Sequence, residues 1–161
     1  MREERPGTFR PDGEVDDTSG VGSRRVRIAT QPSSRGAAAY TETLFRTPQA
    51  AAPARQLTTT ALGTWDLSVL NDAAATVVSE LVGNAAIHAR GAVIRVTVTR
   101  VGERRVRIAV VDKDPVLPVL RDIRPDDTNG RGLRMVDALS VRWGVDVLRW
   151  GKRVWSELET G

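Results

Sequence analysis

Two stretches of alternating residues place the strongest constraint on the fold of this chain. Residues 94–99 alternate between Ile or Val and Arg or Thr, and residues 105–110 alternate between Val or Ile and Arg or Ala. Such a period of two predicts extended strands with one apolar face each. The link between them, residues 101–104, is short and contains Gly102. It therefore favours an antiparallel hairpin whose apolar face has to be covered by another layer.

Two helices are predicted before this hairpin. The first spans residues 48–62, begins with a proline and is followed by Gly63. The second spans residues 67–89, with Asp66 as a candidate N-cap and Gly91 after its end. Apolar residues recur in the second helix at the spacing of one buried face, namely at Ala74, Val77, Val78, Leu81 and Ala85.

The remaining segments complete an α+β pattern. Strands are predicted over residues 41–47, 145–150 and 153–158, a short helix over 133–139, and an irregular proline-containing segment over 112–129. The last two strands are expected to turn at Gly151 and Lys152. The helices are sufficient to cover only one face of a sheet built mostly from hairpins. The expected fold is a two-layer α/β sandwich with a mixed, mostly antiparallel sheet and helices on one face.

The N-terminal segment differs in composition from the rest. Residues 1–38 are rich in Gly, Pro, Ser, Asp and Arg, and such a segment buries too little apolar surface to offset the entropy of ordering it. It is expected to be a flexible tail in which only residues 26–28 could pair as a strand, ahead of a domain over 39–161. No stretch resembles a membrane span or a secretory signal, and cysteine is absent, so a cytoplasmic protein is expected.

The formal net charge of +4 raises the question of nucleic-acid binding. The positive charge is almost entirely arginine spread along the chain, and Lys113 and Lys152 are the only lysines. The nearest approach to a basic patch is Arg24, Arg25 and Arg27, in the predicted tail. No basic run with interleaved aromatics and no zinc-ligand set accompanies it. No direct nucleic-acid contact is expected, and a binder that uses the arginine-rich tail is the least favoured reading.

Three local features carry chemistry. Glu80 and Asn84 lie four residues apart on a predicted helix and share a face. Taken alone, this pair is more typical of a solvated helix edge than of a site. Asp112 ends an apolar strand, a position that turn-forming aspartates also occupy. Residues 130–133, GRGL, stand before a predicted helix. Glycines there let the backbone approach a ligand, and free amides at a helix start attract phosphate.

The order and spacing of these features resemble those of the GHKL (Bergerat-fold) ATPases. "ELVGNA" looks like their N box, "VVDKDP" like their first glycine-box position and "NGRGLRMVD" like their second, and the closing "LSVRWGV…GKRVWSEL" resembles their last strands. The match is closest to the small bacterial anti-sigma-factor serine/threonine kinases and related single-domain regulators. It spans residues 41–158, nearly the whole predicted domain. The chain has no GxxxxGK[ST] motif, so any ATP site is not a P-loop.

The resemblance implies roles for individual residues. Asn84 matches the Mg²⁺ ligand, Glu80 the general base that orients the attacking hydroxyl or water, and Asp112 the acid that accepts from the exocyclic amine of adenine. The turn where a loop becomes a helix and backbone amides meet the phosphates matches Gly130, Arg131, Gly132 and Leu133. ATP and Mg²⁺ are therefore the expected cofactors.

The segment between Asp112 and Gly130 would be the ATP lid, with Arg121 and Arg124 available to the phosphates alongside Arg131. Three features depart from the family pattern. Asp114 and Val116 stand where glycines often follow the adenine-binding Asp, Ile87 where a basic residue is common, and Arg153 where a threonine often lies beside the nucleotide.

The leading expectation is an Mg-ATP-dependent serine/threonine kinase of the anti-sigma type. By resemblance its partners would be a sigma factor and a small antagonist of the anti-anti-sigma type, with a homodimer as a further option. The departures at Ile87 and Arg153 keep open a second reading, a nucleotide-responsive binding module that sequesters a partner without phosphoryl transfer. His88, the only histidine, is expected to pack or cap at the helix end. Core or interface packing is expected of Trp65, Trp143, Trp150 and Trp155.

Overall fold

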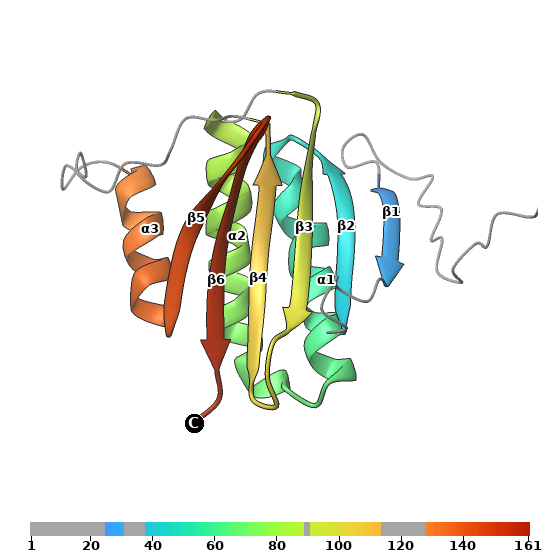
Figure 1. The fold of residues 1–161 in the computed structure, drawn as a ribbon, viewed down its shortest axis with the longest axis vertical. Coiled ribbons are helices and arrows are strands. Elements are labelled where there is room, and N and C mark those ends of the chain that lie inside the picture. Colours follow the sequence, from blue (N-terminus) through green and yellow to red (C-terminus); the bar gives the residue numbers. More distant parts are fainter. Residues whose placement is uncertain (1–24, 31–37, 89–90, 114–127) are drawn as a thin grey trace, which may run out of the picture.

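The computed structural model describes residues 25–30, 38–88, 91–113 and 128–161. These residues form a single six-stranded sheet with helices on one side of it (Figure 1). The strands are β1 (Arg25–Thr30), β2 (Ala39–Phe45), β3 (Val93–Arg100), β4 (Arg105–Asp112), β5 (Arg142–Leu148) and β6 (Gly151–Glu159). The helices are α1 (Ala51–Thr64), α2 (Asn71–His88) and α3 (Thr128–Leu139), with short 3₁₀ turns at Pro48–Ala50 and Ser68–Leu70.

The predicted α+β class is confirmed, but the described sheet is not mixed. Its order is β1-β2-β3-β4-β6-β5, and every pairing is antiparallel. The reason lies in β6. After α3 the chain forms β5, which runs parallel to β4. The last strand, β6, runs in the opposite direction and lies between β4 and β5. β6 thus takes the place of a parallel neighbour and pairs with both strands.

The predicted β3–β4 hairpin is confirmed. Backbone N–H groups of Val101 and Gly102 both donate to the carbonyl of Arg105, at 3.0 and 3.2 Å. The predicted turn at Gly151 and Lys152 is wrong, because Leu148 pairs with Gly151 and the turn consists of residues 149 and 150. Gly151 is therefore the first residue of β6, and it has to be glycine because a Cβ atom there would collide with the end of β4.

The apolar core lies between the sheet and the helices. All five residues of the predicted α2 stripe are buried, and they pack against Ile94, Val96, Val98 and the alternate residues of β4. At one side of this core Tyr40 meets Trp65 edge to face, with ring centroids 5.5 Å apart. No helix in the described part of the chain is both long and apolar enough to cross a membrane.

Helix boundaries differ from the predictions at two places. Gly63 lies inside α1 and Asp66 is not an N-cap; it adopts a left-handed conformation with φ of 57° after the helix. Aspartate tolerates this region better than most residues, so it ends the helix where a glycine was expected. α3 starts five residues earlier than predicted, at Thr128, because the two glycines that suggested a loop are accommodated within its first turns.

Two predicted regions fall largely outside the described residues. β1 lies within the predicted tail and includes residues 26–28, and it pairs with β2. The rest of that segment, 1–24 and 31–37, is outside the described part, as are residues 114–127, which hold most of the predicted ATP lid with Arg121 and Arg124.

Candidate functional site

Three elements converge at one end of the sheet. Figure 1 shows the end of β4, the last turns of α2 and the start of α3 together at the top of the view. This arrangement follows from the topology, since α2 lies over the sheet between α1 and α3 and runs toward the same edge at which β4 ends. Arg46 secures this end of α2: its guanidinium donates to the carbonyls of Ala86 at 2.8 Å and Gly91 at 2.7 Å. A cation at a helix C-terminus also complements the helix dipole.

Glu80 faces the first turns of α3. It is half-buried on α2, and the buried backbone of Gly132 lies directly against its carboxylate. A Cβ atom at position 132 would collide with Glu80 Oε2 and would lie 3.2 Å from Glu80 Cδ. The carboxylate of Glu80 can occupy this position only because residue 132 is glycine.

Asn84 is half-buried one turn farther along α2. A spacing of four residues puts its side chain on the same helix face as Glu80. The structure therefore places Gly132 against Glu80, with Asn84 one turn farther along the same helix. Within the described residues no group of three or more His, Cys, Asp or Glu side chains is positioned to hold a metal ion.

The other residues of the GRGL motif have different positions. Gly130 and Arg131 belong to the first turn of α3, where backbone N–H groups lack an intrahelical partner; the side chain of Arg131 is outside the described part. Leu133 is only 5% exposed. Its side chain contributes to packing, and only its backbone is left for a ligand.

Asp112 is engaged by a residue that the sequence analysis did not single out. Its side chain is 2% exposed, and its Oδ1 accepts a hydrogen bond from Nζ of the equally buried Lys152 at 3.1 Å. The two residues face each other across the β4–β6 ladder. A buried carboxylate is stable as an ion only when it is paired in this way. The signal in the sequence was that one of only two lysines stands in the predicted turn, directly before the last predicted strand.

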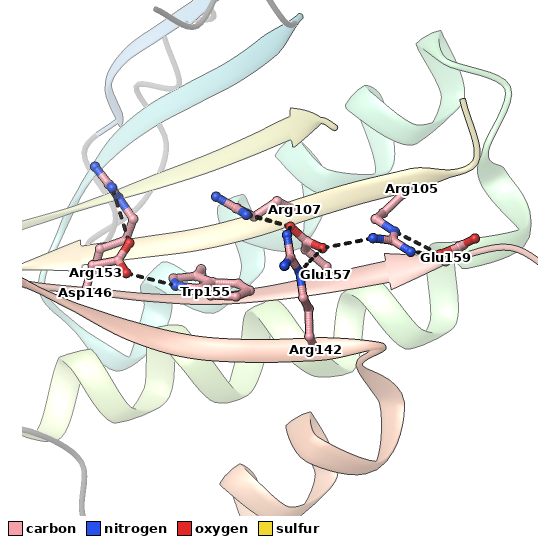
Figure 2. A network of polar contacts seen from close by, with 8 residues as sticks. All are labelled: Arg105, Arg107, Arg142, Asp146, Arg153, Trp155, Glu157 and Glu159. Carbon is pink, nitrogen blue, oxygen red and sulfur yellow. Dashed lines mark hydrogen bonds and ion pairs between the residues drawn. The ribbon is translucent and has the colours of Figure 1, made fainter. Parts of the chain in front are cut away.

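The start of β6 is fixed against this pair by Gly151. A Cβ atom at position 151 would collide with the carbonyl oxygen of Asp112 and lie 2.8 Å from Cα of Lys113. Arg153, by contrast, points away from Asp112. It lies on the opposite face of the sheet, where its Nη1 is 3.5 Å from Oδ2 of Asp146 (Figure 2). Lys152, and not Arg153, is therefore the β6 residue beside the predicted base-reading acid.

A second polar cluster, which the sequence analysis missed, covers the outer face of the sheet, the face without helices (Figure 2). At its centre is the carboxylate of Glu157, only 1% exposed. Arg107 donates to Oε1 from Nη2 at 2.6 Å and from Nε at 3.1 Å. Arg142 donates from Nε to Oε2 at 2.7 Å and from Nη2 to Oε1 at 3.0 Å, and Arg105 adds an ion pair at 3.6 Å.

These contacts change the acid–base properties of the cluster. The hydrogen bond from Arg142 is the largest influence and holds the pKa of Glu157 below its usual value against the opposing effect of burial, with Arg107 adding to the lowering. The same hydrogen bond raises the pKa of Arg142. The alternation of residues 105–110 predicted that two of these arginines face away from the core. Their buried partner could not be predicted, because it comes from β6.

The ring of Trp155 packs against two arginines of the cluster. The guanidinium carbons of Arg107 and Arg142 lie 4.5 and 5.7 Å from the ring centroid, and the indole N–H donates to Asp146 at 3.3 Å. The ring lies across β5 over Gly144, where a Cβ would be 2.9 Å from the ring.

Comparison of the chain with models of known protein families and with curated proteins finds no match to either.

Proposed function

We propose that the protein binds Mg-ATP where β4, α2 and α3 meet, and that it acts as a serine/threonine kinase of the anti-sigma type on a small antagonist protein. The observation that carries this proposal is the direct approach of Gly132 to Glu80. It sets an acid beside the first turns of a helix, where backbone amides and the helix dipole attract phosphate.

The residues present fit a nucleotide with its metal. Asn84 supplies a side-chain oxygen one turn from Glu80, and Mg²⁺ would take its other ligands from phosphate oxygens and water. The bound metal would offset the charge of phosphates placed beside a carboxylate. Glu80 would accept the proton of the attacking hydroxyl, the role of a general base.

The base-reading end of this site combines an acid with a cation. The Asp112 carboxylate would accept from the exocyclic amine of adenine, and Lys152, whose Nζ is 3.1 Å from Oδ1, adds a donor beside it. Lys152 also keeps Asp112 paired when no base is bound. A nucleobase that reaches Asp112 therefore has to share this carboxylate with Lys152.

The test is titration calorimetry with ATP and Mg²⁺, followed by a transfer assay with candidate antagonist proteins. Glu80→Ala should keep ATP affinity and lose transfer by about 100-fold or more. Asp112→Asn should weaken ATP binding by about 10-fold or more, because the negative charge is lost and an N–H₂ donor replaces one of the two acceptor oxygens. Asp72→Asn is a matched control, since Asp72 is exposed at the start of the same helix. Unchanged ATP affinity in Asp112→Asn would contradict the assignment of the base site.

Engagement of Asp112 by Lys152 favours a second candidate function, a nucleotide-responsive binding module without phosphoryl transfer. Exchange of this buried contact on nucleotide binding would give two states that a partner can distinguish. Tight Mg-ATP binding without transfer to any partner would support this candidate. Rapid transfer would exclude it. In both functions the partners proposed, by resemblance, are a sigma factor and an antagonist of the anti-anti-sigma type, and a homodimer is the proposed assembly.

A further inference from the structure

A hollow of about 180 Å³ opens at the end of the sheet beside Trp150. Its walls come from three strands and the β5–β6 turn, and they include Thr43, Arg95, Val111, Asp112, Lys113 and Trp150. Thr43, Arg95 and Val111 stand in one row across β2, β3 and β4. This row belongs to the outer face, because the alternate residues of the same strands form the core.

The size of the hollow limits its occupant. A cavity of about 150 Å³ accommodates one benzene ring, whereas pockets for drug-sized ligands measure about 300–1,000 Å³. The hollow therefore fits one aromatic or branched apolar side chain. Trp150, which is 52% exposed at the rim, is the residue type most often found at the energetic centre of protein interfaces.

Cations surround this hollow. Arg95 and Lys113 are exposed in its wall, and Arg153, 42% exposed, stands opposite Val111 in the next strand. Beyond them the outer-face cluster presents Arg142 and Arg105, which are 59% and 39% exposed. Each guanidinium has five N–H donors, so these arginines retain donors beyond those that Glu157, Glu159 and Asp146 use.

The arginines of the cluster are held in place before any partner arrives. Glu157 fixes Arg107 and Arg142 through two hydrogen bonds each, and both stack on Trp155. Ordering long side chains on binding costs about 0.5–1.5 kcal/mol each. Because Arg107 and Arg142 are already ordered in the folded protein, this entropy loss does not oppose binding. The outer face is therefore preorganised to bind carboxylates.

We propose that the outer face of β3, β4, β6 and β5 docks an acidic segment of a partner protein, which inserts one apolar or aromatic side chain into the hollow beside Trp150. Nucleic acid fits less well, because the Trp155 ring is covered by two arginines and is not open to base stacking. Asp112 of the proposed nucleotide site also lines the hollow, whereas the arginine cluster around Glu157 lies on the side of the sheet away from that site.

The test uses the full chain and three fluorescein-labelled probes in an anisotropy titration. The first is a peptide with a central Phe flanked by Asp and Glu, the second has Ala in place of Phe, and the third is a single-stranded DNA 20-mer. The Phe peptide should bind saturably, and the Ala peptide about 10-fold or more weakly. Amide resonances of residues 93–95, 111–113 and 150 should shift on addition of the Phe peptide.

Three variants locate the binding. Trp150→Ala and Arg95→Glu should each weaken the Phe peptide by about 10-fold or more. Arg134→Glu is the matched control, because Arg134 is an exposed arginine on α3, on the helix side of the sheet. The affinity of this variant for the Phe peptide should equal that of wild type. If Trp150→Ala does not fold, the Ala peptide and Arg95→Glu still test the proposal. Equal affinity for the two peptides, an equal effect of Arg134→Glu, or tighter binding of DNA would overturn it.

Discussion

Replacing Glu157 with glutamine would remove one negative charge from beneath three arginines while keeping the shape of the side chain. In the folded protein this carboxylate accepts four hydrogen bonds, two from Arg107 and two from Arg142, and it is 1% exposed. The glutamine amide would present an N–H₂ group to arginine donors. The variant therefore loses attraction and gains a clash between donors.

The expected cost is about 3 kcal/mol. Removing one partner of a buried ion pair costs about 3–5 kcal/mol, and the lower end applies because the arginines are 33–59% exposed and partly solvated. For a chain of this length 1 kcal/mol lowers the melting temperature by about 2–4 °C. The melting temperature of Glu157→Gln at pH 7 should accordingly fall by about 6–12 °C.

The effect should also depend on pH, and its sign follows from the lowered pKa of Glu157. A carboxyl whose pKa is lower in the folded state stabilises the protein fully above its unfolded pKa, about 4.3. This stabilisation is lost as the pH falls through the folded pKa. The gap in stability between wild type and Glu157→Gln should be constant from about pH 7 to pH 5 and should close at lower pH.

Urea denaturation followed by circular dichroism between pH 3 and pH 7 measures this gap. Glu159→Gln is the matched control. Glu159 lies on the same strand as Glu157 and also pairs with an arginine, Arg105, but its side chain is 36% exposed. An exposed pair contributes about 0–1 kcal/mol, so this variant should remain close to wild type. The reasoning is refuted if Glu157→Gln is no less stable than Glu159→Gln at pH 7.

Three further substitutions act at the proposed nucleotide site. Gly132→Ala should leave the free energy of unfolding within about 1 kcal/mol of wild type, because alanine favours the helix and the Glu80 side chain can rotate away. The displacement of Glu80 should still lower phosphoryl transfer by about 100-fold. Full transfer in this variant would contradict the role of Glu80 as the base. Gly151→Ala should lower the free energy of unfolding by about 2 kcal/mol or more, since its Cβ would meet backbone atoms of Asp112, and an unchanged urea midpoint would contradict this. Lys152→Met should cost about 3 kcal/mol by removing the buried cation that lies 3.1 Å from Oδ1 of Asp112, and adding Asp112→Leu should restore much of the loss in the same denaturation assay.

Local patterns predicted much of the fold. The alternation of residues 94–99 and 105–110 and the apolar stripe of α2 each depend on neighbours within a few positions, and both are confirmed. Asp66 was misassigned because aspartate is common both as an N-cap and in the left-handed conformation. The choice between the two is made by the packing of Trp65 and Leu67 into the core, which no local pattern encodes.

The arrangement of the candidate site was predictable where its residues are close in sequence. Glu80 and Asn84 share one helix, so their common face follows from helix geometry. The partner of Asp112 did not follow, because Lys152 is 40 positions away and faces it only through the pairing of β4 with β6. The burial of Glu157 depends on the same pairing. Strand register between distant segments is set by the whole sheet, and a one-residue change exposes the opposite side chains.

β6 serves two unrelated surfaces with alternate residues. Lys152 lies on the helix side with Asp112, whereas Arg153, Trp155 and Glu157 lie on the outer face. Losing or gaining one residue in this strand would send each of these side chains to the wrong surface at once. The length of β6 is therefore constrained more strictly than its composition. A single substitution alters one face of the sheet and can be compensated by neighbouring residues on that face, but an insertion or deletion within β6 changes both faces together.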